Sequence, residues 1–192
     1  KSNPFVLGTH QTPSSFTHNA WVSDDGNYVF TTDEKPDAYI GSYNISDMSN
    51  IEEVDRIQSN PESNSIPHNT HVDGDFLVTS WYRDGTTIHD ISNPNSLVQV
   101  AYYDSYVGSG DGFDGCWGTY PFLPSGNIIS SEINSSNNQT GQLMIYERGF
   151  SSACYLEGNV TDGNTGNSIS GATVVILNTT IPNSSSSTLS GF

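Results

Sequence analysis

The stretch PHNTHVDGDFLVTSWYRDGTTIHDISNPNSLVQVAYY, residues 67–103, decides how the rest of the sequence is interpreted. Two turns, Asp-Gly and Arg-Asp-Gly, separate runs rich in aromatic and β-branched residues, which are typical of strands. The expected strands are 76–82, 86–91 and 98–103. Asn93-Pro94 ends the second of these, because proline lacks the N–H that a strand ladder needs. The stretch therefore predicts one antiparallel sheet unit, close to a propeller blade in size.

The same unit recurs on both sides of this stretch. Upstream, HNAWV (18–22) and DGNYVFTT (25–32) match HNTHV (68–72) and DGDFLVTS (73–80). Downstream, a third copy opens with WGTY and continues with SGNIISS, at 117–120 and 125–131. The turn glycines of successive copies, Gly26, Gly74 and Gly126, are 48 and then 52 residues apart. A period near 50 with several strands per copy favours propeller blades over helical repeats.

We therefore predict an all-β fold in which 17–149 form a partial β-propeller of about three blades. Alternation along strands places one residue in two on a buried face. The residues expected to pack between the sheets are Trp21, Val29, Phe30, Val72, Phe76, Val78, Trp81, Ile88, Ile91, Ile128, Ile145 and Tyr146.

The sequence motifs of the repeats also resemble those of a known family. His68-Asn69, Asp73-Gly74 and DISNP (90–94), followed by GCWG (115–118) and YPFLPSGNII (120–129), resemble the LVIVD-repeat propellers of secreted bacterial "choice-of-anchor B" proteins. The resemblance covers residues 16–148. It implies a propeller fold and a surface location.

A second domain is expected at 150–192. Its sequence contains Gly158-x-Val160-x-Asp162, then Thr165-Gly166 and Ile169-x-Gly171-Ala172-x-Val174. This pattern resembles the carboxypeptidase regulatory-like domain, a transthyretin-like β-sandwich, and it covers about half of such a domain. We therefore expect a partial sandwich, with a strong strand at 169–177.

Composition narrows the classes of function. Five basic against 21 acidic residues give a net charge of −16, which disfavours nucleic acid and anionic lipid because both need basic patches. No window reaches the roughly 18 apolar residues of a membrane-spanning helix, so membrane insertion is not expected. The charge, together with the resemblance, favours an extracellular or cell-surface location.

Three histidines are candidate metal ligands. His18 and His68 occupy equivalent positions of consecutive repeats, and His71 follows three residues after His68. If equivalent blade positions converge, His18 and His68 share a site that suits a transition metal, which imidazole nitrogens bind. The alternative is that each His-Asn pair caps the first turn of its blade through hydrogen bonds.

A glycine-rich loop offers a different metal. Asp111 and Asp114 are candidate oxygen ligands for Ca²⁺, which prefers flexible, carboxylate-rich loops. Aspartate and glycine are also the usual residues of any tight loop, and that alternative stays open.

Cysteines and sequons complete the set of candidate sites. Cys116 and Cys154 either form a disulfide, as in many secreted proteins, or remain free thiols. The Asn-x-Ser/Thr sequence that accepts N-linked glycans in a glycoprotein occurs at Asn44, Asn134, Asn138, Asn159, Asn178 and Asn183.

No catalytic motif is present, whether a nucleophile elbow, a zinc-protease helix or a phosphate-binding loop. We therefore expect a secreted or cell-surface protein that acts in binding, adhesion or structural display, and not an enzyme. The alternatives are a metal-dependent enzyme that uses the histidines, and an accessory module of a secreted hydrolase.

Assembly is the last expectation. Residues 1–16 are either a tail or a donor strand, since Phe5-Val6-Leu7 is a short apolar run. Three blades do not close a propeller, and half a sandwich leaves an unpaired edge at 173–177, which recruits another strand. Either the chain is a piece of a longer protein, or copies of it exchange strands and form an extracellular fibre.

Overall fold

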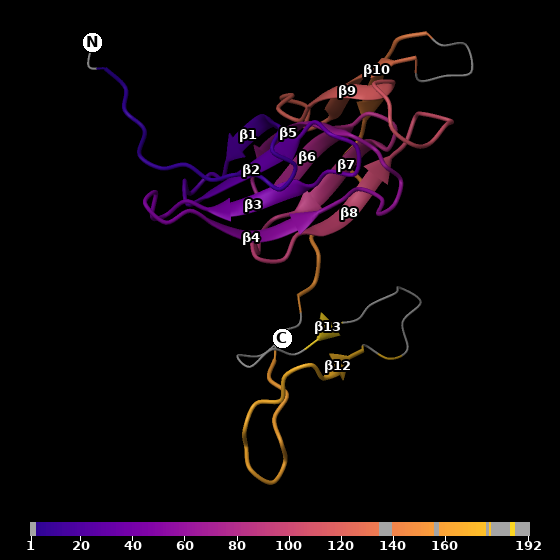
Figure 1. The fold of residues 1–192 in the computed structure, drawn as a ribbon. Coiled ribbons are helices and arrows are strands. Elements are labelled where there is room, and N and C mark those ends of the chain that lie inside the picture. The colour runs from indigo at the N-terminus through magenta and orange to yellow at the C-terminus, as the bar shows by residue number, and fades with distance from the viewer. Residues whose placement is uncertain (1–2, 135–139, 156–157, 176, 178–184, 187–192) are drawn as a thin grey trace. The chain divides into compact units, whose positions relative to one another are not determined.

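The computed structural model describes residues 3–134, 140–155, 158–175, 177 and 185–186 (Figure 1). The described residues contain strands and turns and no helix, so the prediction of an all-β fold is confirmed. Accordingly, no helix in this part of the chain has the length and apolar character needed to cross a membrane.

In the described part of the chain, three antiparallel sheets of three or four strands follow one another, each a meander in which consecutive strands pair. The first sheet contains β1 (Thr17–Val22), β2 (Tyr28–Asp33), β3 (Ile40–Asn44) and β4 (Glu52–Ile57). The second contains β5 (Pro67–Asp73), β6 (Phe76–Trp81), β7 (Gly85–Asp90) and β8 (Val98–Tyr103). The third contains β9 (Gly115–Tyr120), β10 (Ile128–Ile133) and β11 (Gln142–Tyr146).

The same turn links the first two strands of each sheet. Gly26, Gly74 and Gly126 have φ angles of 75°, 61° and 79°, a left-handed conformation that favours glycine. In the first turn the Asp25 carboxylate accepts hydrogen bonds from the Ser23 hydroxyl and the Asn27 N–H. Because each turn needs a glycine at this place, the glycines recur in the sequence with a period near 50 residues.

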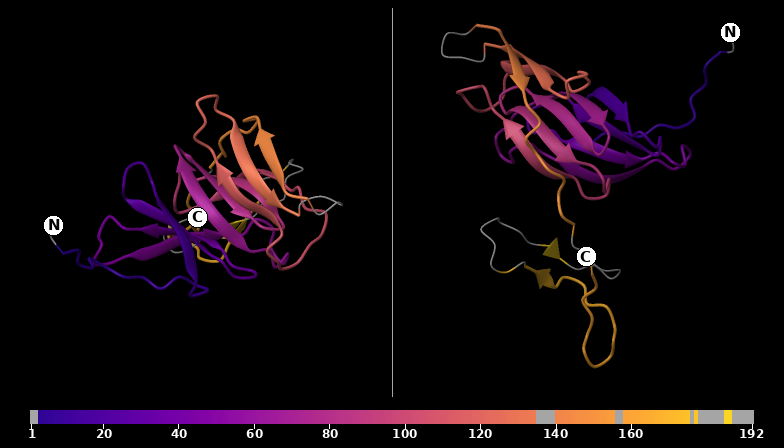
Figure 2. Two further views of the ribbon diagram at one scale, coloured as in Figure 1. Left: turned by 90° about the horizontal axis from the view of Figure 1, so that it is seen from above. Right: turned by 180° about the vertical axis from the view of Figure 1, so that it is seen from behind.

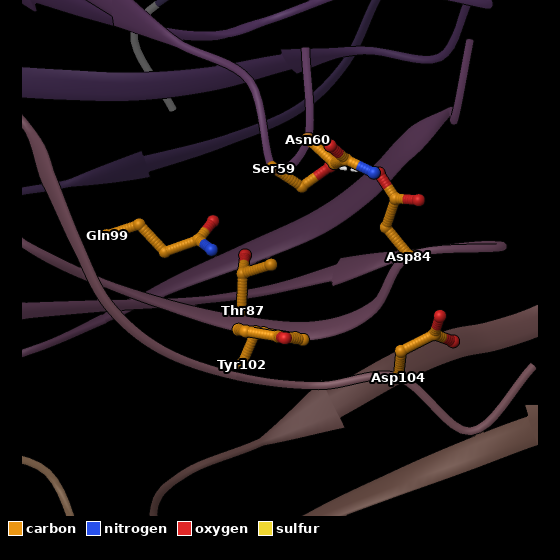
Figure 3. Close-up of a pocket in the computed structure, with 7 residues that line it drawn as sticks. All are labelled: Ser59, Asn60, Asp84, Thr87, Gln99, Tyr102 and Asp104. Atoms are coloured by element: carbon orange, nitrogen blue, oxygen red, sulfur yellow. Dashed lines mark hydrogen bonds between the residues drawn. The ribbon is translucent and has the colours of Figure 1, made fainter. Parts of the chain in front are cut away.

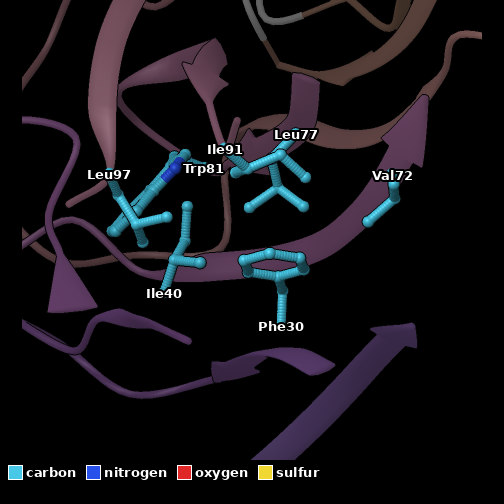
Figure 4. Packing of buried hydrophobic residues seen from close by; sticks show 7 residues of the cluster. All are labelled: Phe30, Ile40, Val72, Leu77, Trp81, Ile91 and Leu97. Carbon is cyan, nitrogen blue, oxygen red and sulfur yellow. The ribbon is translucent and has the colours of Figure 1, made fainter. Parts of the chain in front are cut away.

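The sheets pack side by side in chain order, as the two views in Figure 2 show. Strand β5 contacts β1 and β2 of the first sheet, and β9 contacts β5, β6 and β7 of the second. Between the first two sheets, Phe30 and Ile40 pack toward Leu77 and Trp81 (Figure 4). A second core, formed by Val78, Ile88 and Ile128, joins the second and third sheets.

Most of the predicted packing residues lie inside. Phe30, Val72, Val78, Trp81, Ile88, Ile91 and Ile128 are buried, and Trp21, Val29, Phe76 and Tyr146 are partly buried. The prediction for Ile145 is wrong: it is 64% exposed, because it shares a face of β11 with the exposed Leu143, whereas its neighbour Tyr146 faces the core with the second sheet. Ile40, Ile66 and Leu77, which were not predicted, are buried.

Contacts divide the chain into Lys1–Ala153 and Cys154–Phe192, close to the boundary predicted at residue 150. In the second unit, an isolated bridge joins Thr161 and Ser168, and β12 (Thr173–Val174) pairs with β13 (Ser185–Ser186). The strand expected at 169–177 is thus much shorter where the structure describes it, and its pairing lies within the chain. No sandwich is formed by the described residues of this unit.

The predicted donor segment forms no strand in the described part of the N-terminal region. Phe5, Val6 and Leu7 are 80%, 76% and 59% exposed. Its role as a donor to another copy stays a prediction.

Candidate metal site

A β-bulge occurs at the same place in the first strand of each sheet. The register of β1 against β2 shifts between Thr17 and Asn19, around His18. The register of β5 against β6 shifts between Pro67 and Thr70, around His68, and that of β9 against β10 shifts around Trp117. Bulges redirect side chains and are frequent beside functional sites. The three sheets therefore present His18, His68 and Trp117 from equivalent positions.

Hydrogen bonds between sheets hold two of these bulges. The Thr32 hydroxyl of the first sheet donates to the backbone carbonyl of His68, with a separation of 2.5 Å. At the equivalent position of the second sheet, the Ser80 hydroxyl donates to the carbonyl of Trp117 at 3.2 Å. Because the backbone is fixed at each bulge, the His68 and Trp117 side chains have defined directions.

His18, Glu34 and His68 form one cluster. The rings of His18 and His68 are stacked with centroids 4.5 Å apart. His18 Nδ1 lies 3.1 Å from Glu34 Oε2, and His68 Nε2 lies 3.7 Å from Glu34 Oε1. One ligand atom from each residue lies within 4.8 Å of the other two, and this is the single such group of three in the described part of the chain.

The contacts of His68 determine which of its nitrogens carries the proton. Nδ1 makes a very short contact with the backbone carbonyl of Trp117, and the Asn69 side-chain nitrogen lies 3.0 Å from the same atom. The carbonyl contact is the shorter, and a carbonyl only accepts, so we assign the proton to Nδ1. The lone pair of Nε2 then faces the Glu34 carboxylate. Burial lowers the pKa of His68, so the ring is neutral at neutral pH.

Tyr82 completes the surroundings of the carboxylate. Its hydroxyl donates to Glu34 Oε1 at 2.7 Å, and the ring contacts His68 with centroids 5.1 Å apart. Burial, and then the hydrogen bond to Glu34, raise the pKa of Tyr82, so the phenol keeps its proton. Phe113 packs edge-on against the same ring. Tyr82 is therefore a donor that orients Glu34.

These three side chains fit a divalent transition metal. Two imidazoles and a carboxylate are common zinc ligands, and ligands about 2.0–2.1 Å from a tetrahedral ion lie about 3.3 Å from one another. The separations of 3.1 Å from His18 and 3.7 Å from His68 to the Glu34 oxygens lie on either side of that value. The Trp117 carbonyl on His68 and the phenol on Glu34 are the outer partners that typically orient metal ligands.

His71 does not join this cluster, which corrects its prediction as a ligand. Its ring packs against Trp21 and Phe122, with centroids 4.7 Å and 6.0 Å apart, and burial lowers its pKa. The bulge that turns His68 toward Glu34 ends before His71. The position equivalent to His71 carries Trp21 in the first sheet, so an aromatic role is shared across repeats.

The other candidate sites have different surroundings. The Asp114 carboxylate accepts from Arg83 Nη2 at 2.8 Å, and this bond, followed by the contact with Asn134, lowers the pKa of Asp114. A guanidinium thus neutralises Asp114, and neither Asp114 nor Asp111 belongs to a group of three His, Cys, Asp or Glu ligands among the described residues, so calcium binding at this loop stays a prediction.

Both cysteines are free thiols, so the disulfide alternative is not realised in the structure. Cys116 is buried in β9, 3.3 Å from the Thr86 hydroxyl, and burial raises the pKa of its thiol. Cys154 is exposed at the start of the second unit.

Three of the predicted glycosylation sites can be placed. Asn134 and Asn159 are exposed, whereas Asn44 is partly buried and its side-chain oxygen accepts from the Ser46 N–H and hydroxyl. Asn138, Asn178 and Asn183 lie outside the described residues.

Glu34 is the site residue that the sequence did not reveal. It follows β2 directly, and the register of the repeats makes it equivalent to Tyr82, which follows β6. The alignment of the repeats places Glu34 at the position of Tyr82. Because a glutamate aligned with a tyrosine suggests no shared chemistry, the alignment gave no reason to choose Glu34 as a site residue.

Comparison with known proteins adds no family to this description. No protein-family model matches the chain, and no curated protein matches it.

Proposed function

We propose that the chain is a secreted or cell-surface binding and structural protein whose three sheets are blades of a β-propeller. Within it, His18, Glu34 and His68 bind a divalent transition metal ion such as Zn²⁺. The metal links the first strand of one sheet to the first strand of the next, and it stabilises a module that serves adhesion or display.

One observation carries this proposal: ligand atoms from two separate sheets lie within 4.8 Å of one another around a carboxylate. A neutral imidazole lone pair directed at a carboxylate is unfavourable, and a cation between the two would relieve the repulsion. Zinc ligands must be deprotonated, and the lowered pKa of His68 provides that form at neutral pH.

Titration with Co²⁺ tests the site, because a bound cobalt ion absorbs visible light according to its coordination. We expect one equivalent to give a spectrum of four-coordinate cobalt and Zn²⁺ to displace it. At 100 times its dissociation constant, Zn²⁺ is expected to raise the free energy of unfolding by about 2.7 kcal/mol. His68→Ala should abolish both effects.

His10→Ala is the matched control. His10 is exposed and contacts the Tyr43 ring, so its removal should leave the cobalt spectrum and the zinc stabilisation unchanged. Equal cobalt spectra from the native and His68→Ala proteins would show that the cluster is a hydrogen-bond network without a metal.

One feature favours a metal-dependent enzyme as the second candidate. Three protein ligands leave a fourth position for water or substrate, as in catalytic zinc sites, and the His18 side chain is 32% exposed. If this function applies, the zinc-loaded protein should hydrolyse p-nitrophenyl acetate at least about tenfold faster than its His68→Ala variant. Equal rates would leave a purely structural metal.

A further inference from the structure

A polar pocket of about 270 Å³ lies apart from the metal site, beside the second sheet (Figure 3). Thr87 on β7 and Gln99 and Tyr102 on β8 line it from the sheet. Ser59 and Asn60, from the connector after β4, line the opposite side. We call it the acidic pocket, because Asp84 and Asp104 lie together at one end of it.

The two carboxylates set the charge that the pocket accepts. None of the described residues that line it is positively charged. Asp84 Oδ2 accepts hydrogen bonds from the hydroxyls of Ser59 and Ser63, at 2.5 Å and 2.9 Å. Asp104 Oδ1 accepts from the Tyr106 N–H at 2.8 Å. Neutral donors hold both carboxylates in place without cancelling their charge, so the pocket disfavours anions and favours cations.

The electrostatic surroundings of Asp104 agree with this. Burial raises its pKa, and the carboxylates of Asp84 and Glu132 raise it further. A positive charge placed between Asp84 and Asp104 would relieve this repulsion.

A buried hydroxyl points independently to a ligand. Thr87 is 1% exposed, and its Oγ1 has no hydrogen-bond partner in the structure. The side chain projects into the space between Gln99 and Asp84 (Figure 3). An unpaired buried hydroxyl is destabilising, and each such group in a native protein calls for an explanation. A ligand that donates a hydrogen bond to Thr87 supplies one.

Tyr102 provides an aromatic surface beside that hydroxyl. It pairs with Thr87 across the β7–β8 ladder and is 70% exposed. A cation that lies over an aromatic face is attracted by the ring quadrupole. Carboxylates and an exposed aromatic ring together are suited to an organic ammonium group.

A bare metal ion fits less well. The acidic pocket supplies no group of three carboxylate or imidazole ligands within 4.8 Å of one another. The carboxylates occupy one end, Gln99 the other, and Thr87 and Tyr102 the space between (Figure 3). The ligand should therefore be elongated, with a positive charge at the end that meets the two carboxylates.

We propose that the acidic pocket binds a primary alkylammonium group, whose three N–H donors serve Asp84, Asp104 and the Thr87 hydroxyl and whose alkyl chain lies along Tyr102. A free diamine and the lysine side chain of a peptide both carry this group.

Isothermal titration of the full chain with cadaverine tests the proposal. Asp104→Asn is expected to weaken binding about tenfold or more, since hydrogen bonds to charged groups contribute that much. Tyr102→Ala is expected to weaken it about 3- to 30-fold. Thr87→Val should weaken binding and raise the melting temperature of the free protein, because it removes an unpaired hydroxyl and keeps the shape. Asp24→Asn, at an exposed acid elsewhere, should bind normally.

Three further ligands separate the alternatives. N-acetyl-lysine methylamide is the peptide counterpart of cadaverine, and the tighter of the two identifies the natural source. Equal binding of 1,5-pentanediol, which has the same length without charge, would overturn the proposal in favour of a neutral polyol. Displacement of cadaverine by an equimolar amount of Ca²⁺ would overturn it in favour of a metal site, and absence of cadaverine binding would overturn it outright.

Discussion

Replacing Trp81 by alanine is expected to lower the free energy of unfolding of the sheet unit by about 3–5 kcal/mol. Trp81 is 1% exposed and lies on β6 in the cluster that joins the first two sheets. Its removal leaves a cavity between sheets that have no covalent link beyond the connector. Guanidinium unfolding at neutral pH measures the loss.

Trp117→Ala is the matched control, since the same side chain is removed from a position that is 52% exposed. We expect this variant to lose less than half as much stability, because much less apolar surface leaves water when Trp117 folds. Equal losses for the two tryptophans would contradict the role of Trp81 in joining the sheets.

The second large effect concerns pH and His89. This residue lies on β7 opposite Gln99, is fully buried, and burial lowers its pKa to about 3. The unfolded chain binds a proton at His89 below about pH 6.5, whereas the folded chain does so only near pH 3. The stability that the neutral ring provides is therefore complete above about pH 6.5 and is lost as the pH falls.

Between pH 7 and pH 5 the loss from His89 is expected to be about 2 kcal/mol. Carboxylates titrate mostly below this pH window. His68 and His71, whose pKa values are also lowered, are present in both the native protein and the His89→Leu variant, so they contribute equally to the pH dependence of both. Urea unfolding of the native protein and of His89→Leu at both pH values measures the difference. Identical pH dependence in the two proteins would refute the claim that His89 causes this loss of stability.

The strands were predictable because one local device recurs. An Asp-Gly or Ser-Gly turn requires a left-handed glycine, and the strands on either side must alternate to bury one face. Which face of a sheet is covered was less accessible, since it depends on how the sheets pack. Ile145 has the pattern of a buried strand residue, yet it is exposed because it lies on the face of β11 opposite to Tyr146, which packs toward the second sheet.

The site residues likewise divide into those that the sequence indicated and those that it did not. His18 and His68 were found because they repeat, and repeated positions meet when the sheets pack side by side. Glu34 was missed because its equivalent, Tyr82, differs in chemistry. The acidic pocket combines a connector, a turn and two strands, so no continuous stretch of sequence indicates it.

A crystal grown with Zn²⁺ and measured at the zinc absorption edge shows directly whether His18, Glu34 and His68 bind the ion. We expect one strong anomalous peak about 2.0–2.2 Å from a ring nitrogen of His18, from His68 Nε2 and from a Glu34 oxygen. The same experiment on Glu34→Gln should show a much weaker peak at that position. Strong zinc peaks elsewhere on the acidic surface, with none between His18 and His68, would show that these residues do not form a metal site.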